Sequence, residues 1–215
     1  MTSQSSTSIT ALGAAGTVTG SKFLLRHRDV SVLFDCGMFQ GGRDLRQRNW
    51  DEFDFDPAGL DADVFSHAHL DHCGLLPRLV RVGFRGTVHC TADTSRLMSV
   101  VLPDSGRIHE EDARHANKAG YSRHEPALPL YTEDDAWAAL DLVRSHDFGH
   151  AVIVADGVRV TFSPAGHILG SAVTRIELDD GPTVVFSGDL GRPNHPLLMA
   201  PSGAGRCDHL FVEST

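Results

Sequence analysis

Four side chains of types that commonly bind metal ions lie within six positions of this chain: His67, His69, Asp71 and His72. They follow the short run Asp63–Phe65, so the two leading histidines are predicted to stand where a strand ends. Side chains two residues apart in extended backbone point to the same side, so His67 and His69 can bind one ion. Asp71 and His72 come where the chain turns toward a helix, and they can face a second ion.

Two further residues of the same kind follow later strands. The run Val160–Pro164 leads to His167 in a glycine-flanked turn, and Thr183–Phe186 leads to Asp189. A carboxylate can place one oxygen on each of two ions, which an imidazole cannot, so Asp189 is predicted to bridge them. Taken singly, His167 could be a hydrogen-bonded turn histidine and Asp189 a turn-forming residue. Their shared position at strand ends favours a joint metal site.

A third strand end offers Asp35, in the segment Val32–Gly37. Its carboxylate is predicted either to bind an ion or to orient a histidine that does. Burying the cluster unpaired would cost about 1–3 kcal/mol for each polar group, which argues against a packing role. The alternative to a metal site is a solvated, histidine-rich turn. The remaining histidines have no comparable context, and core or surface roles are predicted for them, including His89, His109, His115, His146 and His150.

Composition places the chain among ordinary globular proteins. Its 215 residues, 41% of them hydrophobic and 22% charged, suit one domain. No apolar run is long enough to cross a bilayer, and residues 1–8 lack the features of a signal peptide, so a disordered lead-in is predicted there. The four cysteines show no paired spacing, which favours a reducing cytoplasm. The net charge of −9 argues against binding nucleic acid by bulk charge alone, but not against a nuclease whose metal ions supply the positive charge.

The elements that would position these residues follow from the spacing of apolar side chains. Short β-rich runs predict strands at Ile9–Leu12, Lys22–Arg26, Val30–Asp35, Val64–Ser66, Thr87–His89, Ala151–Val154, Val158–Phe162, Ala172–Leu178, Thr183–Phe186 and Leu210–Val212. Helices are predicted at Leu75–Val82, Thr94–Leu102 (before Pro103), Glu110–Ala119 and Tyr131–Val143, the last with a capping box of Thr132 and Asp135. Residues 41–50 are predicted to be a solvated loop and 106–130 an exposed excursion. The irregular alternation of strands and helices favours stacked layers over a doubly wound sheet.

The run His67-Ala-His69-Leu-Asp71-His72, with a later histidine and aspartate, resembles the metallo-β-lactamase superfamily. Within it, several segments resemble the β-CASP nucleases, the group that includes RNase J and the eukaryotic pre-mRNA cleavage endonuclease. These segments are Leu12–Gly20, Phe34–Gly41, Ala165–Ser171 and Val212–Thr215, and Arg107–Asp112 and Tyr121–Thr132 are similar to bacterial and archaeal members. The resemblance covers nearly all of the chain after Ser8.

This resemblance implies an αββα sandwich, of the α/β (α+β) class, with two zinc ions at the edge between the sheets. The implied ligands are His67, His69 and His167 for the first ion, Asp71 and His72 for the second, and Asp189 between them. Zinc lowers the pKa of bound water to about 7, and Asp71 would orient that water for attack. In the family, a glutamate at the position of Glu213 opens the cap domain and helps to position a catalytic histidine. Manganese or iron is also compatible with such a ligand set.

The family pattern also implies regions beyond those present here. A β-CASP cap is expected after Thr215, followed by a return of the chain that supplies the last ligand of the second zinc ion and the general acid. We therefore expect residues 9–211 to form an incomplete metallo-β-lactamase domain and 212–215 to begin the cap, with the second zinc ion bound weakly. An incomplete sheet has an open edge, which a second copy of the chain could cover.

Three functions follow from these residues. The favoured one is a zinc-dependent ribonuclease of RNA processing or decay, with little activity in this chain alone. The zinc motif also permits a hydrolase of a small ester, thioester or lactone, although the β-CASP segments argue against it. The third is a catalytically silent metal-binding domain that binds a partner.

Overall fold

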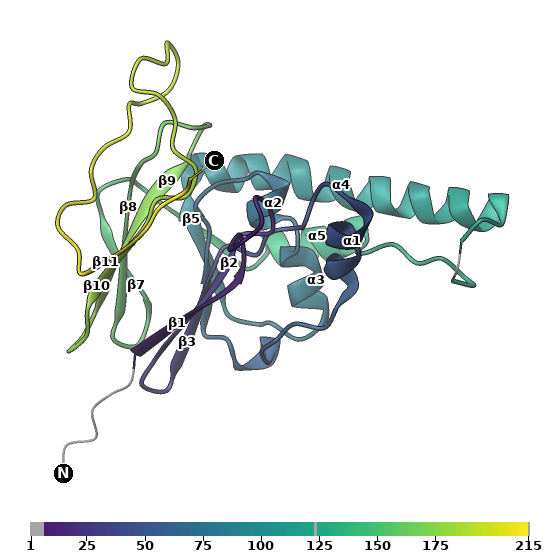
Figure 1. Ribbon diagram of the computed structural model, residues 1–215, viewed down its shortest axis with the longest axis horizontal. Coiled ribbons are helices and arrows are strands. Elements are labelled where there is room, and N and C mark those ends of the chain that lie inside the picture. The colour runs from purple at the N-terminus through teal and green to yellow at the C-terminus, as the bar shows by residue number, and fades with distance from the viewer. Residues whose placement is uncertain (1–6, 123, 215) are drawn as a thin grey trace.

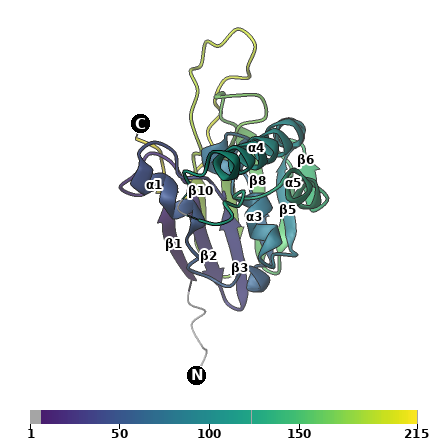
Figure 2. The same cartoon turned by 90° about the vertical axis from the view of Figure 1, so that its right-hand side faces the viewer.

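The computed structural model describes residues 7–122 and 124–214, which form two β-sheets packed face to face (Figure 1). Helices cover the outer face of the first sheet, as the perpendicular view shows (Figure 2). The predicted stacked layers of sheets and helices are thus confirmed. Among the described residues no helix covers the outer face of the second sheet, so the layers are helix, sheet and sheet.

The first sheet has the order β1-β2-β3-β4-β5-β6, and the second has the order β11-β10-β9-β8-β7. The strands of the first sheet are β1 (Thr7–Gly13), β2 (Lys22–His27), β3 (Val30–Phe34), β4 (Ala62–Val64), β5 (Thr87–Thr91) and β6 (Val143–His146). Those of the second are β7 (Ala151–Ala155), β8 (Val158–Pro164), β9 (Ala172–Leu178), β10 (Thr183–Phe186) and β11 (His209–Phe211). The helices are α1 (Arg43–Gln47), α2 (Leu70–Cys73), α3 (Leu76–Arg81), α4 (Ala92–Ala119) and α5 (Glu133–Leu140), with 3-10 turns at Arg48–Trp50 and Pro57–Gly59.

The alternation of side chains along β3 shows how one strand serves two cores. Leu33 points to the helices and belongs to the cluster that includes Leu76, Leu79 and Leu102. Val32 and Phe34 point the other way, into the cluster between the sheets with Phe162 and Phe186. Because both faces of the central strands are buried, these strands are mostly apolar.

The long helix α4 corrects two sequence predictions. It runs from Ala92 to Ala119 without interruption at Pro103, where a stop was predicted, and it contains the first half of the predicted excursion 106–130. A proline inside a helix removes one backbone hydrogen bond and costs about 3 kcal/mol. Here Pro103 is buried against the domain, and Gly106 lies so close to α5 that an added Cβ would stand 2.7 Å from the Thr132 carbonyl oxygen. Tertiary packing therefore offsets the local preference of proline.

Other boundaries differ by small amounts. The capping box of Thr132 and Asp135 is present, but α5 ends at Leu140, and Val143 begins a strand that was not predicted. A short helix and a 3-10 turn occupy much of the predicted loop 41–50. The predicted lead-in was too long, since Thr7 already pairs with His27 in β1; residues 1–6 lie outside the described part. Within the described residues, no helix is both long and apolar enough to cross a membrane.

Candidate metal centre

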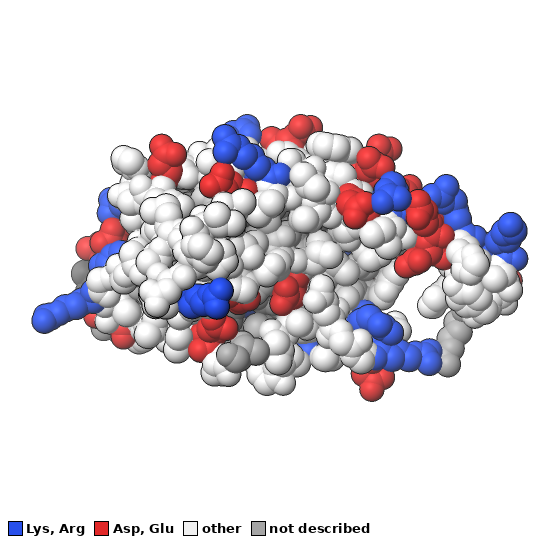
Figure 3. All heavy atoms as spheres, turned by 90° about the horizontal axis from the view of Figure 1, so that it is seen from above, with Lys and Arg blue, Asp and Glu red and all other residues white. Residues whose placement is uncertain are grey.

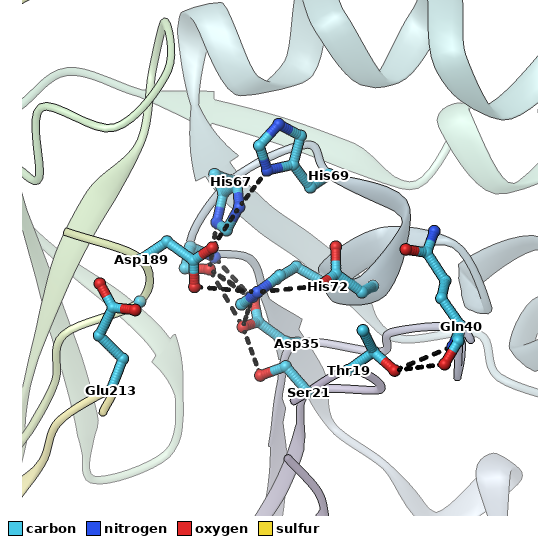
Figure 4. Close-up of polar contacts among 12 residues, drawn as sticks. Thr19, Ser21, Asp35, Gln40, His67, His69, His72, Asp189 and Glu213 are labelled. Atoms are coloured by element: carbon cyan, nitrogen blue, oxygen red, sulfur yellow. Dashed lines mark hydrogen bonds and ion pairs between the residues drawn. The ribbon is translucent and has the colours of Figure 1, made fainter. Parts of the chain in front are cut away.

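The predicted ligands converge at one edge of the two sheets, on four separate segments (Figure 4). His67 and His69 lie in the loop after β4, and α2 carries the next two predicted ligands. His167 and Asp189 follow β8 and β10 of the second sheet. The backbone N–H of Ala172 donates to the Ser66 carbonyl oxygen at 2.9 Å, which joins the two sheets beside the cluster.

The first group of donors is compact. His67 Nε2 lies 3.1 Å from His69 Nδ1, which lies 3.2 Å from His167 Nε2. Asp189 Oδ2 lies 3.4 Å from His167 Nε2 and 3.7 Å from His67 Nε2, and all four donor atoms are within 4.8 Å of one another. A tetrahedral zinc ion with bonds of about 2.0–2.1 Å needs donors roughly 3.3 Å apart. The distances between these donor atoms match that requirement, so these residues fit a zinc ion.

The second group of donors is looser. The other oxygen of Asp189, Oδ1, lies 3.2 Å from His72 Nε2, so the two oxygens of this carboxylate face different groups. Asp71 Oδ2 lies 4.0 Å from His72 Nε2. This arrangement supports Asp189 as the residue between two ions. It offers the second ion one imidazole and two carboxylates among the described residues.

Asp35 orients His72. Its buried Oδ2 accepts a hydrogen bond from His72 Nδ1 at 2.8 Å and one from Ser21 Oγ at 2.9 Å, while Oδ1 accepts the Ser66 backbone N–H at 2.9 Å. With Nδ1 occupied, the imidazole of His72 presents Nε2 to the site. The hydrogen bonds of Asp35 lie behind the histidine rather than in the donor cluster, an arrangement that fits the orienting role better than that of a ligand.

The loop that carries His167 is fixed by hydroxyl groups. Ser171 Oγ accepts the backbone N–H groups of His167 at 2.9 Å and Ile168 at 3.2 Å. At the start of α4, Thr91 and Thr94 both donate their hydroxyls to the Gly170 carbonyl oxygen, at 2.7 and 3.0 Å. Sequence analysis did not single out these hydroxyls. Of the three, only Ser171 lay in a segment, Ala165–Ser171, that sequence analysis had cited for its resemblance to the β-CASP nucleases.

Two glycines let the loops of the site approach closely. A Cβ on Gly37 would stand 1.7 Å from the Asp71 carbonyl oxygen, where the exit of β3 meets α2. A Cβ on Gly191 would stand 1.7 Å from the Gly166 carbonyl oxygen, where the loop after β10 meets the loop after β8. Any side chain at either position would separate loops that carry donors.

The electrostatics of the cluster favour metal binding. Burial, followed by the neighbouring His72, holds the pKa of His67 well below its ordinary value, and burial followed by His167 lowers the pKa of His69. Burial alone would raise the pKa of Asp189, but the hydrogen bond and charge of His72 outweigh it and lower that pKa to about 2. Burial would lower the pKa of His72, but the carboxylates of Asp35 and Asp189 raise it to about 10. The lowered pKa values of His67, His69 and Asp189 favour the neutral imidazole and the ionised carboxylate that bind a cation, whereas the raised pKa of His72 means that it must release a proton to bind one.

A cavity of about 670 Å³ opens beside the second group. Phe23, Phe34 and Phe186 line its apolar side, and His72, Asp189 and Glu213 line its polar side. Glu213 comes from the segment after β11, and its Oε1 accepts the Leu190 backbone N–H at 2.5 Å. The contacts described above therefore bring the residues predicted for the site to one place, with Glu213 at its border, and Figure 4 shows His67, His69, His72, Asp189 and Glu213 among them.

Comparison with known proteins agrees with this geometry. The sequence profile of the metallo-beta-lactamase superfamily matches residues 15–211. The chain is 37% identical over 207 residues to ribonuclease TTHA0252 of Thermus thermophilus, and the aligned region covers 96% of this chain and 43% of that protein. It is 35% identical over 214 residues to transcription termination factor FttA of Methanothermobacter thermautotrophicus, with 96% and 31% covered. It is 29% identical over 208 residues to endoribonuclease YSH1 of Gibberella zeae, with 95% and 23% covered.

These relatives are of the β-CASP type, and the chain spans less than half the length of each. Two solved structures share the fold. A metallo-beta-lactamase from Cronobacter sakazakii aligns with a TM-score of 0.50 at 22% identity over 88% of this chain and 67% of that one. The metallo-beta-lactamase fold protein YhfI from Bacillus subtilis aligns with a TM-score of 0.50 at 17% identity, over 86% and 63%.

Proposed function

This chain belongs to the metallo-beta-lactamase superfamily, and we propose that it is the metal-binding region of a zinc-dependent RNA phosphodiesterase of the β-CASP type. The observation that carries the proposal is the placement of Asp189, whose two oxygens face two separate sets of donors. Two ions about 3.5–4 Å apart are the usual arrangement for in-line attack at phosphorus. The similarity to a ribonuclease and an endoribonuclease supports RNA as the substrate class.

The roles of the individual residues follow from their positions. His67, His69 and His167 would hold the first zinc ion, Asp71 and His72 the second, and Asp189 both. When bound, the ions would lower the pKa of a coordinated water and neutralise charge on the phosphate. Asp71, 4.0 Å from His72 Nε2, is assigned the role of accepting a proton from a water and orienting it. Asp35 keeps His72 in the tautomer that exposes Nε2.

Charge on the protein itself gives little attraction for RNA. On the face seen in Figure 3, basic and acidic side chains of the described residues are interspersed rather than gathered in one basic patch. The net charge of the chain is −9. We therefore assign the recognition of phosphate in this region to the metal centre, with manganese or iron as alternatives to zinc.

Two other functions remain as competitors. A hydrolase of small esters, thioesters or lactones would use the same metal centre, but the relatives named above do not favour it. A silent metal-binding domain would need a damaged centre, whereas the four donors of the first group are complete and closely spaced. We also propose a cytoplasmic location, because all four cysteines are free thiols. Pairing of two copies through an open sheet edge at β11 or β7 is part of the same proposal.

Metal content and cleavage test the proposal together. We expect this chain to bind a first zinc ion more tightly than a second, as measured by elemental analysis after stepwise chelation. We expect little cleavage of a labelled RNA by this chain, and clear zinc-dependent cleavage by a longer version that includes a β-CASP cap. Hydrolysis of a small ester with intact RNA by the longer version would overturn the ribonuclease proposal, and equal tight binding of two ions would contradict the looser second group.

A further inference from the structure

The segment after β11 holds the loop that carries Asp189. The Ser187 backbone N–H donates to the Phe211 carbonyl oxygen at 2.9 Å, and the Glu213 backbone N–H donates to Ser187 Oγ at 3.1 Å. Glu213 Oε1 then accepts the backbone N–H of Leu190, the residue next to Asp189. Three hydrogen bonds thus connect residues 187–190 to residues 211–213, and the last of them ends on a carboxylate.

The loop around Asp189 has a second attachment on its other side. The Gly191 backbone N–H donates to the Ala165 carbonyl oxygen at 2.8 Å, which ties the loop to the segment that carries His167. Asp189 therefore stands between an attachment on the His167 side and an attachment on the cavity side. The cavity-side attachment is Glu213, whose carboxylate is exposed to the same cavity as Asp189 and His72.

The opposite end of the same strand pair carries a matching contact. Asp208 Oδ2 accepts the backbone N–H of Thr183, the first residue of β10, at 2.8 Å. The two carboxylates therefore make the same kind of bond at the two ends of the parallel pair β10–β11. Only the Glu213 contact lies beside a metal donor. Asp208 provides a natural control.

From this geometry we propose that Glu213 is a positioning residue for Asp189, and that it sets the affinity of the second metal ion. The first ion has three imidazoles on loops that are held independently, so it tolerates a small movement of Asp189. The second has His72 and Asp71, 4.0 Å apart, and depends more on Asp189 Oδ1. This role needs only a hydrogen-bond acceptor at Glu213; it needs neither a proton carrier nor a metal ligand there. The inference rests on the proposed function, because it presumes two metal ions.

Three variants of the full chain test the role: Glu213→Ala, Glu213→Gln and the control Asp208→Ala. The measurement is the affinity of the first and second zinc ions, obtained by competition with a chromophoric chelator. Glu213→Ala is expected to weaken the second ion about 10-fold and the first by less than about 3-fold, in the range known for residues that orient ligands. Glu213→Gln keeps an acceptor oxygen, so it is expected to restore most of the second-ion affinity. Asp208→Ala removes the acceptor of the Thr183 backbone N–H, so it is expected to lower the unfolding temperature without changing either affinity.

The outcomes separate this inference from the proposed function. If the unaltered chain binds no zinc, the proposed function fails first. If it binds two ions and Glu213→Ala leaves the second affinity unchanged, the positioning role is overturned. If Glu213→Gln is as damaging as Glu213→Ala, Glu213 acts through its charge or as a ligand, and the hydrogen-bond role is again overturned. Equal loss of second-ion affinity in Asp208→Ala would mean that the pairing of β10 with β11 alone is responsible.

Discussion

The two sides of the metal centre are built differently. On the histidine side, three imidazole donors come from two loops, and those loops are fixed by buried hydroxyls and by hydrogen bonds between the sheets. On the carboxylate side, His72 and Asp189 border a cavity of about 670 Å³, and His72 depends on one buried carboxylate behind it. Closed packing leaves the first group little room to rearrange, whereas the second is held by fewer contacts. The candidate donors therefore divide into a rigid half, formed by His67, His69 and His167, and an adjustable half, formed by Asp71, His72 and Asp189.

Removing a donor from the rigid half should have the largest effect. His67→Ala takes away an imidazole whose side chain is fully buried, so we expect affinity for the first zinc ion to fall by more than about 100-fold. Elemental analysis and chelator competition measure this, with circular dichroism as the check on folding. The exposed His150→Ala is the matched control and should leave the affinity unchanged. A first-ion affinity that survives His67→Ala would place the ion elsewhere.

The adjustable half should respond to Asp35→Asn. An asparagine amide cannot accept from His72 Nδ1, Ser21 and Ser66 together as the carboxylate does, so His72 loses its fixed tautomer. We expect affinity for the second zinc ion to fall about 10–100-fold and that for the first to change by less than about 3-fold. Chelator competition resolves the two steps.

Asp61→Asn is the control for that experiment. Asp61 accepts the Ser31 backbone N–H at 2.8 Å near the opposite end of β3, far along the strand from Asp35. It should leave both affinities unchanged. Equal weakening of the two ions by Asp35→Asn would show that the two halves are not independent.

A smaller effect is expected where the rigid half has several supports. Ser171→Ala removes the acceptor of the His167 and Ile168 backbone N–H groups, and Gly170 remains held by the start of α4. We expect the free energy of unfolding to fall by about 1–3 kcal/mol, measured by urea denaturation, and first-ion affinity to fall only a few-fold. Ser99→Ala, on the exposed side of α4, controls for the loss of a hydroxyl. A second-ion effect larger than the first-ion effect would reverse the assignment of rigid and adjustable halves.

The smallest effect concerns a histidine pair that does not belong to either half. Burial, and then the neighbouring His146, lowers the pKa of His89 to about 4, and the two rings share a hydrogen bond of 2.9 Å. The unfolded chain takes up a proton near pH 6.5 while folded His89 does so near pH 4, so stability should fall as pH drops through that window. Unfolding temperatures of the metal-free chain from pH 7 to pH 4 measure this fall. His89→Gln should reduce it, and an identical fall in both proteins would rule out His89 as a source.

Sequence analysis grouped the candidate donors because His67, His69, His167 and Asp189 follow strand ends, where alternation and turn residues are visible locally, and because Asp71 and His72 come within a few residues of the first of these. It also found the capping box, whose two residues are three positions apart. It misplaced the end of the helix at Pro103, because the packing that offsets the proline comes from α5, more than 25 residues further along the chain. It missed β6 for a related reason: a strand of four residues is defined by pairing with β5 rather than by its own pattern.

The sequence alone determined which atoms could bind a metal and in what order they occur, because residue type and short spacing carry that information. Only the tertiary structure decided how those atoms are shared. The division of the Asp189 oxygens between two groups, the contact of Asp35 with His72, and the contact of Glu213 with Leu190 all join residues at least 22 positions apart. Such contacts depend on how loops from different strands pack together, and local preferences of the backbone do not encode that packing.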